Sequence, residues 1–326
     1  MLVDNFFISS NAHNRELQIM NNKLQYEKND ILVKVKYAQF GKALYRSFSK
    51  QNKALGSLIS GIIENDNPYF KKGNSIIFDP HGSCGKCINC INNDIENCVK
   101  KEKYRLYPCG LSKNIVINSA ASKYVYEINP ENSLCALYTE LVACALHSVK
   151  LSNIKNNNKI LIVGSGQMAL IHIQLIRFFY PNNNIYCMYK SEVKKQLIKR
   201  LGAKPIYINQ KINSEFDIVF EVTGNHTNYK RVIKYCKNGG KIVFFGGCGK
   251  DKKAFIDINY IHYHNQTLIG SYHYNNSEFY DALKLIESKC IDINCIISHI
   301  LKFEDIVDYK KIIINEDYTS IVVKMS

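Results

Sequence analysis

The 326-residue sequence has no apolar run of eighteen residues, which is about the length that a membrane-spanning helix requires. Its first ten residues lack the basic start and the cleavage site of a signal peptide, because Asp4 and Asn5 interrupt them. Blocks of lysine or arginine are also missing, although the formal net charge is +15. We therefore expect a cytoplasmic protein with no membrane partner, whose positive field favours phosphorylated small molecules; nucleic-acid binding through the basic surface is the last-ranked alternative.

The composition is that of a soluble globular protein, with 46% hydrophobic and 22% charged residues. The length exceeds what one hydrophobic core usually organises, so two domains are expected. Internal repeats and a long linker are absent. In a cytosolic chain the 12 cysteines should be reduced or metal-bound and not paired as disulfides.

The first part of the chain has no alternation of strands and helices. Residues 1 to about 80 predict short strands and turns, because Ile31–Tyr37 alternates apolar and polar residues as a half-buried strand does. The further strands expected before residue 130 are Gly61–Ile63, Ser75–Phe78, Ile115–Ile117 and Lys123–Glu127. A helical pattern then covers Ser133–Val149.

A glycine motif follows the apolar strand at 159–163 and precedes an apolar helix, Ile171–Tyr180. In this arrangement Gly164 permits a tight turn, Gly166 lets the backbone approach a pyrophosphate, and Ala169 stands where a third glycine usually allows close packing. The helix N-terminus offers amide groups to phosphates. An ordinary strand-to-helix turn is the alternative. The predicted cofactor-binding residues of this turn are Gly164, Ser165, Gly166, Gln167 and Met168.

Beyond this turn the pattern alternates between strands and helices, which predicts a doubly wound parallel sheet. The predicted strands are Ile160–Val163, Ile185–Met188, Ile206–Ile208, Asp217–Glu221, Lys241–Phe245 and Thr267–Gly270. The predicted helices after the first are Glu192–Leu201, Tyr229–Cys236 and Glu278–Ser288. Residues 296–325 return to a strand, a helix and a strand.

Four cysteines lie within fifteen residues of a glycine-containing loop, at Cys84, Cys87, Cys90 and Cys98. Thiolates at this density suit one tetrahedral zinc, which can stabilise a lobe that has almost no apolar core. An iron–sulfur cluster and empty thiols are the alternatives, although the typical cluster spacings are absent. The zinc would be structural, since four sulfurs leave no open coordination position.

These features together resemble the medium-chain, zinc-type alcohol and polyol dehydrogenases, over nearly the whole chain. The landmarks are Val33–Lys36, Leu55-Gly56 with Gly61, the lobe 82–90, Tyr138–His147, Val163–Ala169 and Asn238–Gly246. Within the family, Thr139-Glu140-Leu141 with Leu146-His147 is most similar to the polyol, sorbitol-like and sugar-phosphate branch.

The resemblance implies an α/β protein with a GroES-like catalytic domain, a Rossmann domain and a homo-oligomeric assembly. We assign residues 1–135 to the GroES-like domain, with the zinc lobe at 81–108. Residues 136–290 form the Rossmann dinucleotide-binding domain, and 291–326 return to the catalytic domain.

The chain departs from the family at the catalytic zinc. Family members that oxidise alcohols hold this metal with Cys-Gly-Ser/Thr-Asp and Gly-His-Glu motifs, where this chain has residues 39–45, Gln-Phe-Gly-Lys-Ala-Leu-Tyr, and 56–58, Gly-Ser-Leu. Neither Ser57 nor Leu58 can replace the missing ligands, and of the usual set only Glu140 matches. We therefore predict one zinc, held by the four cysteines.

Another group must then assist the carbonyl chemistry that the metal would have supported. The predicted catalytic residues are Lys42, Tyr45, Glu140 and His147, with Arg46 as a further candidate beside Tyr45. Without a metal, Glu140 requires a lysine partner or protonation. As alternatives, Tyr45 and His147 are structural side chains and Lys42 is a solvated surface lysine.

An NAD-selective site needs an acid about twenty residues beyond the glycine turn, at the end of the second strand. This position is Tyr189, followed by Lys190 and Ser191, a cation and a hydroxyl able to bind a 2′-phosphate while Tyr189 stacks near the adenine. NADP(H) is therefore favoured over NAD(H), unless Glu192 reaches back or Lys190 only faces water.

The resulting hypothesis is an oxidoreductase that transfers hydride between NADP(H) and a small carbonyl, alcohol, polyol or sugar-phosphate substrate. A metal-free reductase of an activated C=C bond is one alternative. A dinucleotide-binding sensor or scaffold that has lost catalysis is another.

Overall fold

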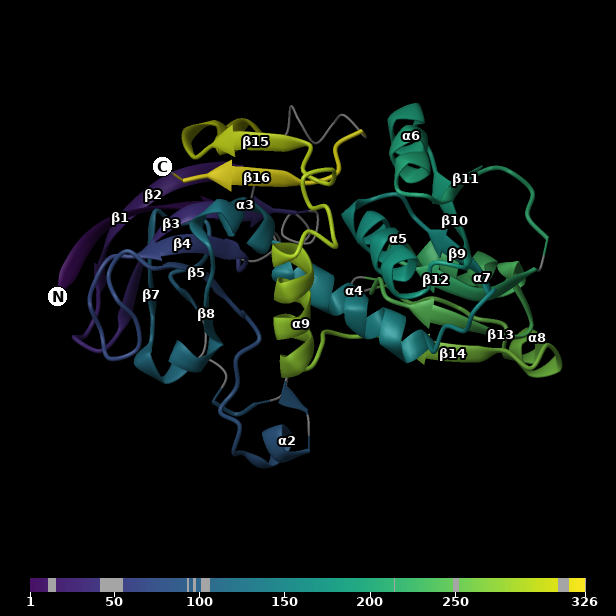
Figure 1. Cartoon of the computed structure of the whole chain (residues 1–326), viewed down its shortest axis with the longest axis horizontal. Coiled ribbons are helices and arrows are strands. Elements are labelled where there is room, and N and C mark those ends of the chain that lie inside the picture. The colour runs from purple at the N-terminus through teal and green to yellow at the C-terminus, as the bar shows by residue number, and fades with distance from the viewer. Residues whose placement is uncertain are drawn as a thin grey trace. The chain divides into compact units, whose positions relative to one another are not determined.

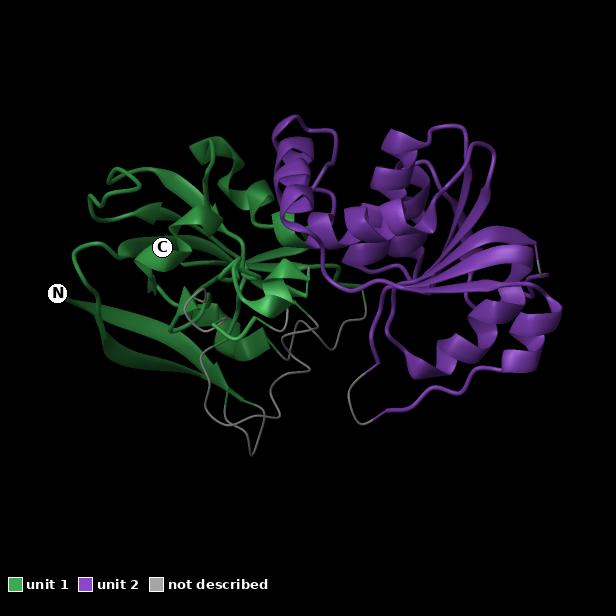
Figure 2. Cartoon of the chain, turned by 90° about the horizontal axis from the view of Figure 1, so that it is seen from below, with its two compact units in different colours: residues 1–140, 297–326 green, residues 141–296 purple. Residues whose placement is uncertain are grey.

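The computed structural model describes residues 1–10, 16–41, 55–92, 94–95, 98–100, 106–213, 215–248, 252–309 and 317–325. The chain divides into two compact units (Figure 2). Unit 1 comprises Met1–Glu140 and Ile297–Ser326, and unit 2 comprises Leu141–Ile296. The expected fold class, a β-rich part plus a doubly wound parallel sheet, is confirmed.

Unit 1 contains an eight-stranded sheet in which only the β15–β16 pair is parallel. The order along the sheet is β15-β16-β3-β4-β5-β8, with β7 paired to β3 and β6 to β7 (Figure 1). Its strands are β3 (Ile31–Phe40), β4 (Ile59–Ile63), β5 (Ser75–Phe78), β6 (Leu106–Tyr107), β7 (Asn114–Ile117), β8 (Val125–Glu127), β15 (His299–Lys302) and β16 (Ile321–Lys324). Strand β3 crosses the core of the unit, because its apolar residues Ile31, Val33 and Val35 are fully buried.

A separate two-stranded antiparallel sheet is formed by β1 (Leu2–Ser10) and β2 (Leu17–Gln25). These strands are longer than the short strands expected here, since asparagine and lysine interrupt the apolar alternation that marks a strand. Asn5 connects this hairpin to β7, because its side-chain oxygen accepts a hydrogen bond of 2.9 Å from the Asn114 amide.

Short helices complete unit 1. They are α2 (Ile88–Ile91), η3 (Ser119–Tyr124), η4 (Pro130–Asn132), α3 (Ser133–Ala136) and η5 (Glu304–Asp308). The predicted strand from Lys123 is wrong at its start, because Lys123 belongs to the 3₁₀ helix η3. The Asn118 side chain accepts a hydrogen bond from the Ala120 amide and so caps that helix.

The single helix predicted from Ser133 to Val149 is also wrong, since it is divided into α3 and α4 (Thr139–Ser152). The Thr139 hydroxyl donates to the Ala136 carbonyl over 2.7 Å, so a side chain caps the end of α3. Among the described residues, no single helix has the length and apolar character of a membrane span. The helical segments 130–136 and 139–152 meet this criterion of length and composition only when they are taken together, and they are bent by 54° relative to each other.

Unit 2 contains a six-stranded parallel sheet with the order β11-β10-β9-β12-β13-β14 and helices on both faces (Figure 2). Its strands are β9 (Lys159–Val163), β10 (Asn184–Tyr189), β11 (Lys204–Tyr207), β12 (Phe216–Glu221), β13 (Cys236–Phe244) and β14 (Thr267–Gly270). Its helices after α4 are α5 (Gln167–Phe179), α6 (Glu192–Arg200), α7 (His226–Tyr235), α8 (Ile258–Tyr263) and α9 (Asn276–Glu287). The strand order reverses between β9 and β12, which is where such sheets bind dinucleotides.

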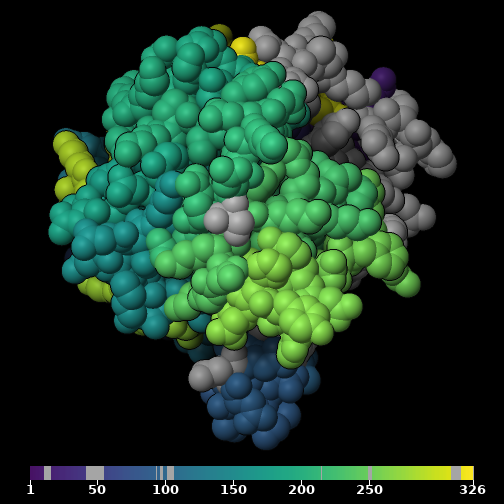
Figure 3. All heavy atoms as spheres, turned by 90° about the vertical axis from the view of Figure 1, so that its right-hand side faces the viewer, coloured from purple at the N-terminus to yellow at the C-terminus, as the bar shows by residue number. Residues whose placement is uncertain are grey.

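Strand β14 is an edge of this sheet, and α8, which was not predicted, lies shortly before it in the chain. Figure 3 shows this region in light green on the surface of unit 2. Phe255, Ile258 and Tyr263 expose 71%, 68% and 80% of their surface there. An exposed apolar group beside an edge strand is a feature of protein–protein contact surfaces.

Candidate functional site

The turn between β9 and α5 has the backbone geometry that a bound phosphate requires. Gly164 has a φ of 130°, and a Cβ there would lie 2.8 Å from Thr223 Cγ2, so only glycine is accommodated. Gly166 is the N-cap of α5 without a side-chain cap, and a Cβ there would meet no atom of the described residues within 4 Å. The space in front of Gly166 is therefore open to a ligand. Ala169 is fully buried where α5 packs on the sheet.

The other predicted residues of this turn, Ser165, Gln167 and Met168, lie beside Gly166 and are partly exposed. The first backbone hydrogen bond within the helix runs from the Leu170 amide to the Gly166 carbonyl, at 3.2 Å. The amides before Leu170 therefore point out of the helix end, where the positive end of the dipole attracts an anion.

The end of β10 contains no acidic side chain within the strand. Tyr189 packs against Tyr207, with ring centroids 5.7 Å apart, and Lys190 is exposed. The Ser191 hydroxyl caps α6 by accepting a bond of 3.4 Å from the Lys194 amide.

Glu192 contacts other residues of its own helix. Its carboxylate lies 3.1 Å from Lys195 Nζ and accepts a bond of 3.0 Å from the Gln196 amide group. The hydrogen bond to Lys195 lowers the pKa of Glu192 below its usual value. Glu192, the acid that could reach back to select NAD, thus binds residues of its own helix, α6.

The four cysteines of the lobe are brought together. All four Sγ atoms lie within 4.8 Å of one another, with Cys84–Cys90 at 3.8 Å and Cys87–Cys90 at 3.4 Å. A tetrahedral zinc with Zn–S bonds of about 2.3 Å separates its sulfurs by about 3.8 Å. Hydrogen bonding from the Cys90 amide lowers the pKa of Cys87 to about 6, which favours the thiolate form that binds metal. This donor set fits a structural zinc.

Phe40, Ser57 and Leu58 lie in the two segments where the resembled dehydrogenases have their catalytic-zinc motifs. Phe40, at the end of β3, is 1% exposed and packs edge-to-face on Tyr309 at 5.3 Å. Leu58 is 7% exposed and Ser57 faces solvent. None of these three side chains offers the nitrogen, sulfur or carboxylate that zinc needs, so they do not fit the metal. Lys42, Tyr45 and Arg46 lie outside the described residues.

Glu140, at the start of α4, lies against a histidine among the described residues, whereas the sequence predicted a lysine partner or protonation. His81 Nε2 lies 3.2 Å from Glu140 Oε1, and both side chains are mostly buried, at 16% and 14% exposure. The His81 amide donates to Asp79 Oδ1 over 2.9 Å, which fixes the loop that follows β5. His81 was not among the residues predicted from the sequence. The Asp-Pro-His run just before Cys84 and the need of Glu140 for a partner were the available signals.

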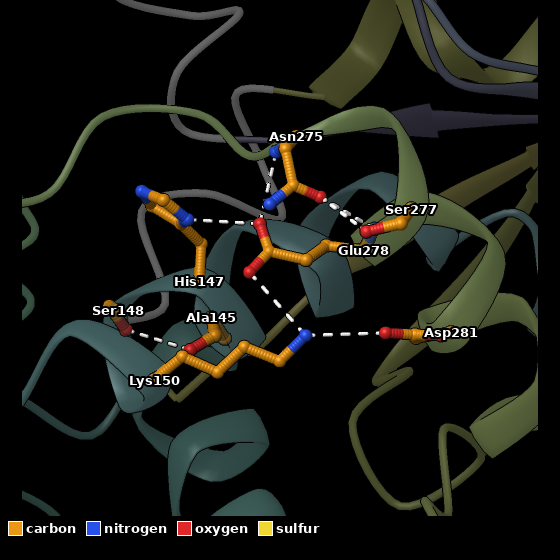
Figure 4. A network of polar contacts seen from close by, with 8 residues as sticks. All are labelled: Ala145, His147, Ser148, Lys150, Asn275, Ser277, Glu278 and Asp281. Carbon is orange, nitrogen blue, oxygen red and sulfur yellow. Dashed lines mark hydrogen bonds and ion pairs between the residues drawn. The ribbon is translucent and has the colours of Figure 1, made fainter. Parts of the chain in front are cut away.

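His147 belongs to a polar network inside unit 2 (Figure 4). Its Nδ1 lies 2.9 Å from Glu278 Oε2, and Glu278, 3% exposed, also lies 3.5 Å from Lys150 Nζ. Glu278 in addition accepts from the Asn275 amide at 3.0 Å, as part of the capping box of α9. The network joins α4 to α9, so the geometry around His147 matches the structural alternative.

The sequence and the fold both have relatives. A family model for zinc-binding dehydrogenases matches residues 166–288. An uncharacterized zinc-type alcohol dehydrogenase-like protein of Escherichia coli is 22% identical over 73% of this chain and 70% of its own. D-altritol 5-dehydrogenase of Agrobacterium fabrum is 22% identical over 76% and 75%.

A solved structure shares the whole fold. It is a putative zinc-binding dehydrogenase of Sinorhizobium meliloti bound to NADP, with a TM-score of 0.85, 20% identity, and coverage of 99% of this chain and 100% of that one. The shared fold, the glycine turn and the cysteine lobe agree with the sequence relatives. In sequence and fold the chain is similar to zinc-type, medium-chain alcohol dehydrogenase-like proteins, and its residues 166–288 match the zinc-binding dehydrogenase model.

Proposed function

We propose that the chain is an NADP(H)-dependent oxidoreductase that transfers hydride between the nicotinamide and a small alcohol or carbonyl, of the polyol or sugar-phosphate class. The observation that supports this most is the turn at Gly164 and Gly166, where the backbone leaves open space in front of the amides of α5. The names of the relatives, an altritol dehydrogenase among them, support the substrate class.

When bound, the nicotinamide supplies or accepts the hydride. The residues of this chain would bind and orient it. The amides at the start of α5 would bind the pyrophosphate, and Lys190 with the Ser191 hydroxyl would bind the 2′-phosphate. The carboxylate of Glu192 binds Lys195 and Gln196, so it is not directed at the ribose hydroxyls as the acid of an NAD site would be. This supports NADP(H) over NAD(H).

Oxidation of an alcohol also releases the hydroxyl proton, and Phe40, Ser57 and Leu58 offer no ligand for a zinc that would stabilise the alkoxide. The pair of His81 and Glu140 would take up this proton, since an imidazole nitrogen accepts a proton and the carboxylate lies 3.2 Å from His81 Nε2. Lys42 and Tyr45 remain further candidates. Under this proposal the chain holds one zinc, bound by the four cysteines.

We also propose a homo-oligomer. The edge strand β14 and the exposed Phe255, Ile258 and Tyr263 offer both backbone groups and apolar surface to a second copy. Light scattering of the purified chain measures this, and a monomer at micromolar concentration would contradict it.

The test of function combines zinc content, nucleotide titration and turnover on purified protein. We expect one zinc per chain, tighter binding of NADPH than of NADH, and NADPH oxidation with ketoses or ketose phosphates. His81→Ala should lower kcat, with NADPH affinity unchanged. Turnover only with activated alkenes would favour the C=C reductase. Tight NADPH binding without any turnover would favour a sensor.

A further inference from the structure

Glu221 is a fully buried carboxylate at the last position of β12. One of its oxygens accepts hydrogen bonds from the Thr223 amide, at 3.1 Å, and from the Thr223 hydroxyl, and the other accepts from the Gly224 amide at 3.0 Å. Burial raises the pKa of Glu221, and these donors oppose that effect. A buried acid without a cationic partner needs such donors, so Glu221, Thr223 and Gly224 form one unit, the Glu221 clasp.

The clasp fixes the chain that follows β12. The Thr223 hydroxyl accepts bonds of 3.0 Å from both the Asn225 amide and the Asn228 side chain, so the clasp extends to the start of α7. The main-chain carbonyl of Glu221 meanwhile accepts from the amides of Phe245 and Gly246, both at 3.0 Å. One residue thus holds the turn after β12 and the turn after β13.

The clasp also lies against the glycine turn. A Cβ on Gly164 would lie 2.8 Å from Thr223 Cγ2, and a Cβ on Gly246 would lie 2.2 Å from the Gly224 amide nitrogen. The turns that follow β9, β12 and β13 are therefore in direct contact at the carboxyl edge of the sheet. Because strand order reverses between β9 and β12, this is the edge at which a dinucleotide crosses the sheet.

We propose that Glu221 is a positioning residue for dinucleotide binding, which holds the β12 and β13 turns against the half of the ligand that lies beyond the pyrophosphate. The proposal rests on the proposed function, since it assumes that a dinucleotide binds at this edge. The adenine half lies on the other side of the switch point, near β10, and does not touch the clasp.

The chemistry requires a carboxylate because the donors around Glu221 face an acceptor on both oxygens. Glutamine has the same shape but carries one amide nitrogen, whose hydrogens would oppose an N–H of Thr223 or Gly224. Glu221→Gln should therefore open the turn although it fills the same volume. Thr223→Val removes the hydroxyl, which donates to Glu221 and accepts from Asn225 and Asn228, but it keeps the carboxylate and both backbone donors and is the milder variant.

Asp217→Asn is the matched control. Asp217 is an acid on the same strand that accepts from a backbone amide, of Lys159, at 2.6 Å, but it lies at the opposite end of β12. Each variant is titrated with NADPH and with 2′,5′-ADP, which carries the adenine half alone. Thermal unfolding of each variant is recorded alongside.

We expect Glu221→Gln to weaken NADPH binding about tenfold and Thr223→Val about threefold, as the loss of buried hydrogen bonds implies. The affinity for 2′,5′-ADP should change less than about twofold, and Asp217→Asn should leave both affinities unchanged. Wild-type affinity for NADPH should also fall at acid pH more than that of Glu221→Gln.

Equal weakening of both ligands, or unchanged NADPH binding in Glu221→Gln, would overturn the positioning role. If Glu221→Gln does not fold, Thr223→Val decides by the same comparison. If the wild-type chain binds neither ligand, the proposed function itself fails, which is a different result.

Discussion

The two units differ in how much of the family's chemistry they retain. In unit 2 the turn has the positive φ at Gly164, the open space at Gly166 and the free amides of the helix end. In unit 1 the cysteine cluster is complete, but Phe40 and Leu58 stand where a second metal would need ligands. Nucleotide binding depends on backbone geometry that the fold itself preserves. Metal binding depends on a few side chains, which single substitutions can remove.

The largest effect should come from the zinc proposed for the cysteine cluster of unit 1. Cys84→Ser removes one of four thiolates and should abolish zinc binding, since structural zinc sites contribute about 10–16 kcal/mol in small domains at pH 7. Zinc per chain falls from one to none, and the lobe becomes sensitive to proteolysis. Metal analysis and limited proteolysis measure this, with Cys109→Ser as the control in the same unit. Zinc retained in Cys84→Ser, or iron in the wild type, would contradict the structural zinc.

The next-largest effect is expected when either glycine of the nucleotide turn in unit 2 is replaced by alanine. Gly164→Ala forces a Cβ to 2.8 Å from Thr223 and a φ of 130° on alanine, so we expect about 1–3 kcal/mol of destabilisation and loss of NADPH binding.

Gly166→Ala places its Cβ in open space at a φ of −82°, so the fold should keep its stability while the phosphate is excluded. Thermal unfolding and NADPH fluorescence titration separate the two. Normal NADPH binding by Gly166→Ala would mean that the ligand does not approach this turn, and the contrast between the units would be lost.

The same contrast explains how much could be predicted from the sequence. The strand, the glycine turn and the cysteine spacing are local patterns, so the parallel sheet and the cysteine cluster followed from them. His81 and Glu140 are 59 residues apart, and Glu221 acts through a turn whose neighbours come from β9 and β13. No local pattern predicts such contacts, because they form only when the sheets are assembled. The sequence shows directly that residues 40, 57 and 58 are not zinc-ligating types, but it does not show that His81 lies beside Glu140.

A buried histidine on α5, the helix that follows the glycine turn, should make unit 2 less stable at acid pH. His172 on α5 is fully buried, with its Nδ1 2.7 Å from the Met168 carbonyl and its Nε2 2.7 Å from the Ser148 hydroxyl. Burial lowers its pKa to about 4, below the usual 6.5. The unfolded chain therefore binds a proton below pH 6.5 that the folded chain refuses, so stability is full above pH 6.5 and is lost as the pH falls toward 4.

We expect this residue to account for about 3 kcal/mol of lost stability over that range. His172→Phe keeps an aromatic ring against Phe220 and Phe245 and should show a flatter pH dependence. Unfolding in urea between pH 7 and pH 4 measures the difference between the two proteins. Parallel pH curves for wild type and His172→Phe would mean that the histidine is not held neutral.

The smallest effect is expected at His147, the predicted catalytic side chain that belongs to unit 2. Its substitution distinguishes a structural role from a catalytic one. Burial raises the pKa of Glu278, but the hydrogen bonds from His147 and Asn275 outweigh it and leave that pKa below its usual 4.5. The contribution of the ionised Glu278 to stability is thus present above about pH 4.5 and is lost as the pH falls further.

His147→Ala leaves the buried carboxylate of Glu278 short of a donor and should cost about 1–2 kcal/mol of stability at pH 7. The ammonium of Lys150 is half exposed, so Lys150→Ala should lower the free energy of unfolding by only about 0.3 kcal/mol. Urea unfolding gives these values, and the kcat of the folded His147→Ala enzyme should equal that of the wild type. A large fall in kcat with little change in stability would return His147 to the reaction, and unit 2 would then contribute a catalytic side chain as well as the nucleotide turn.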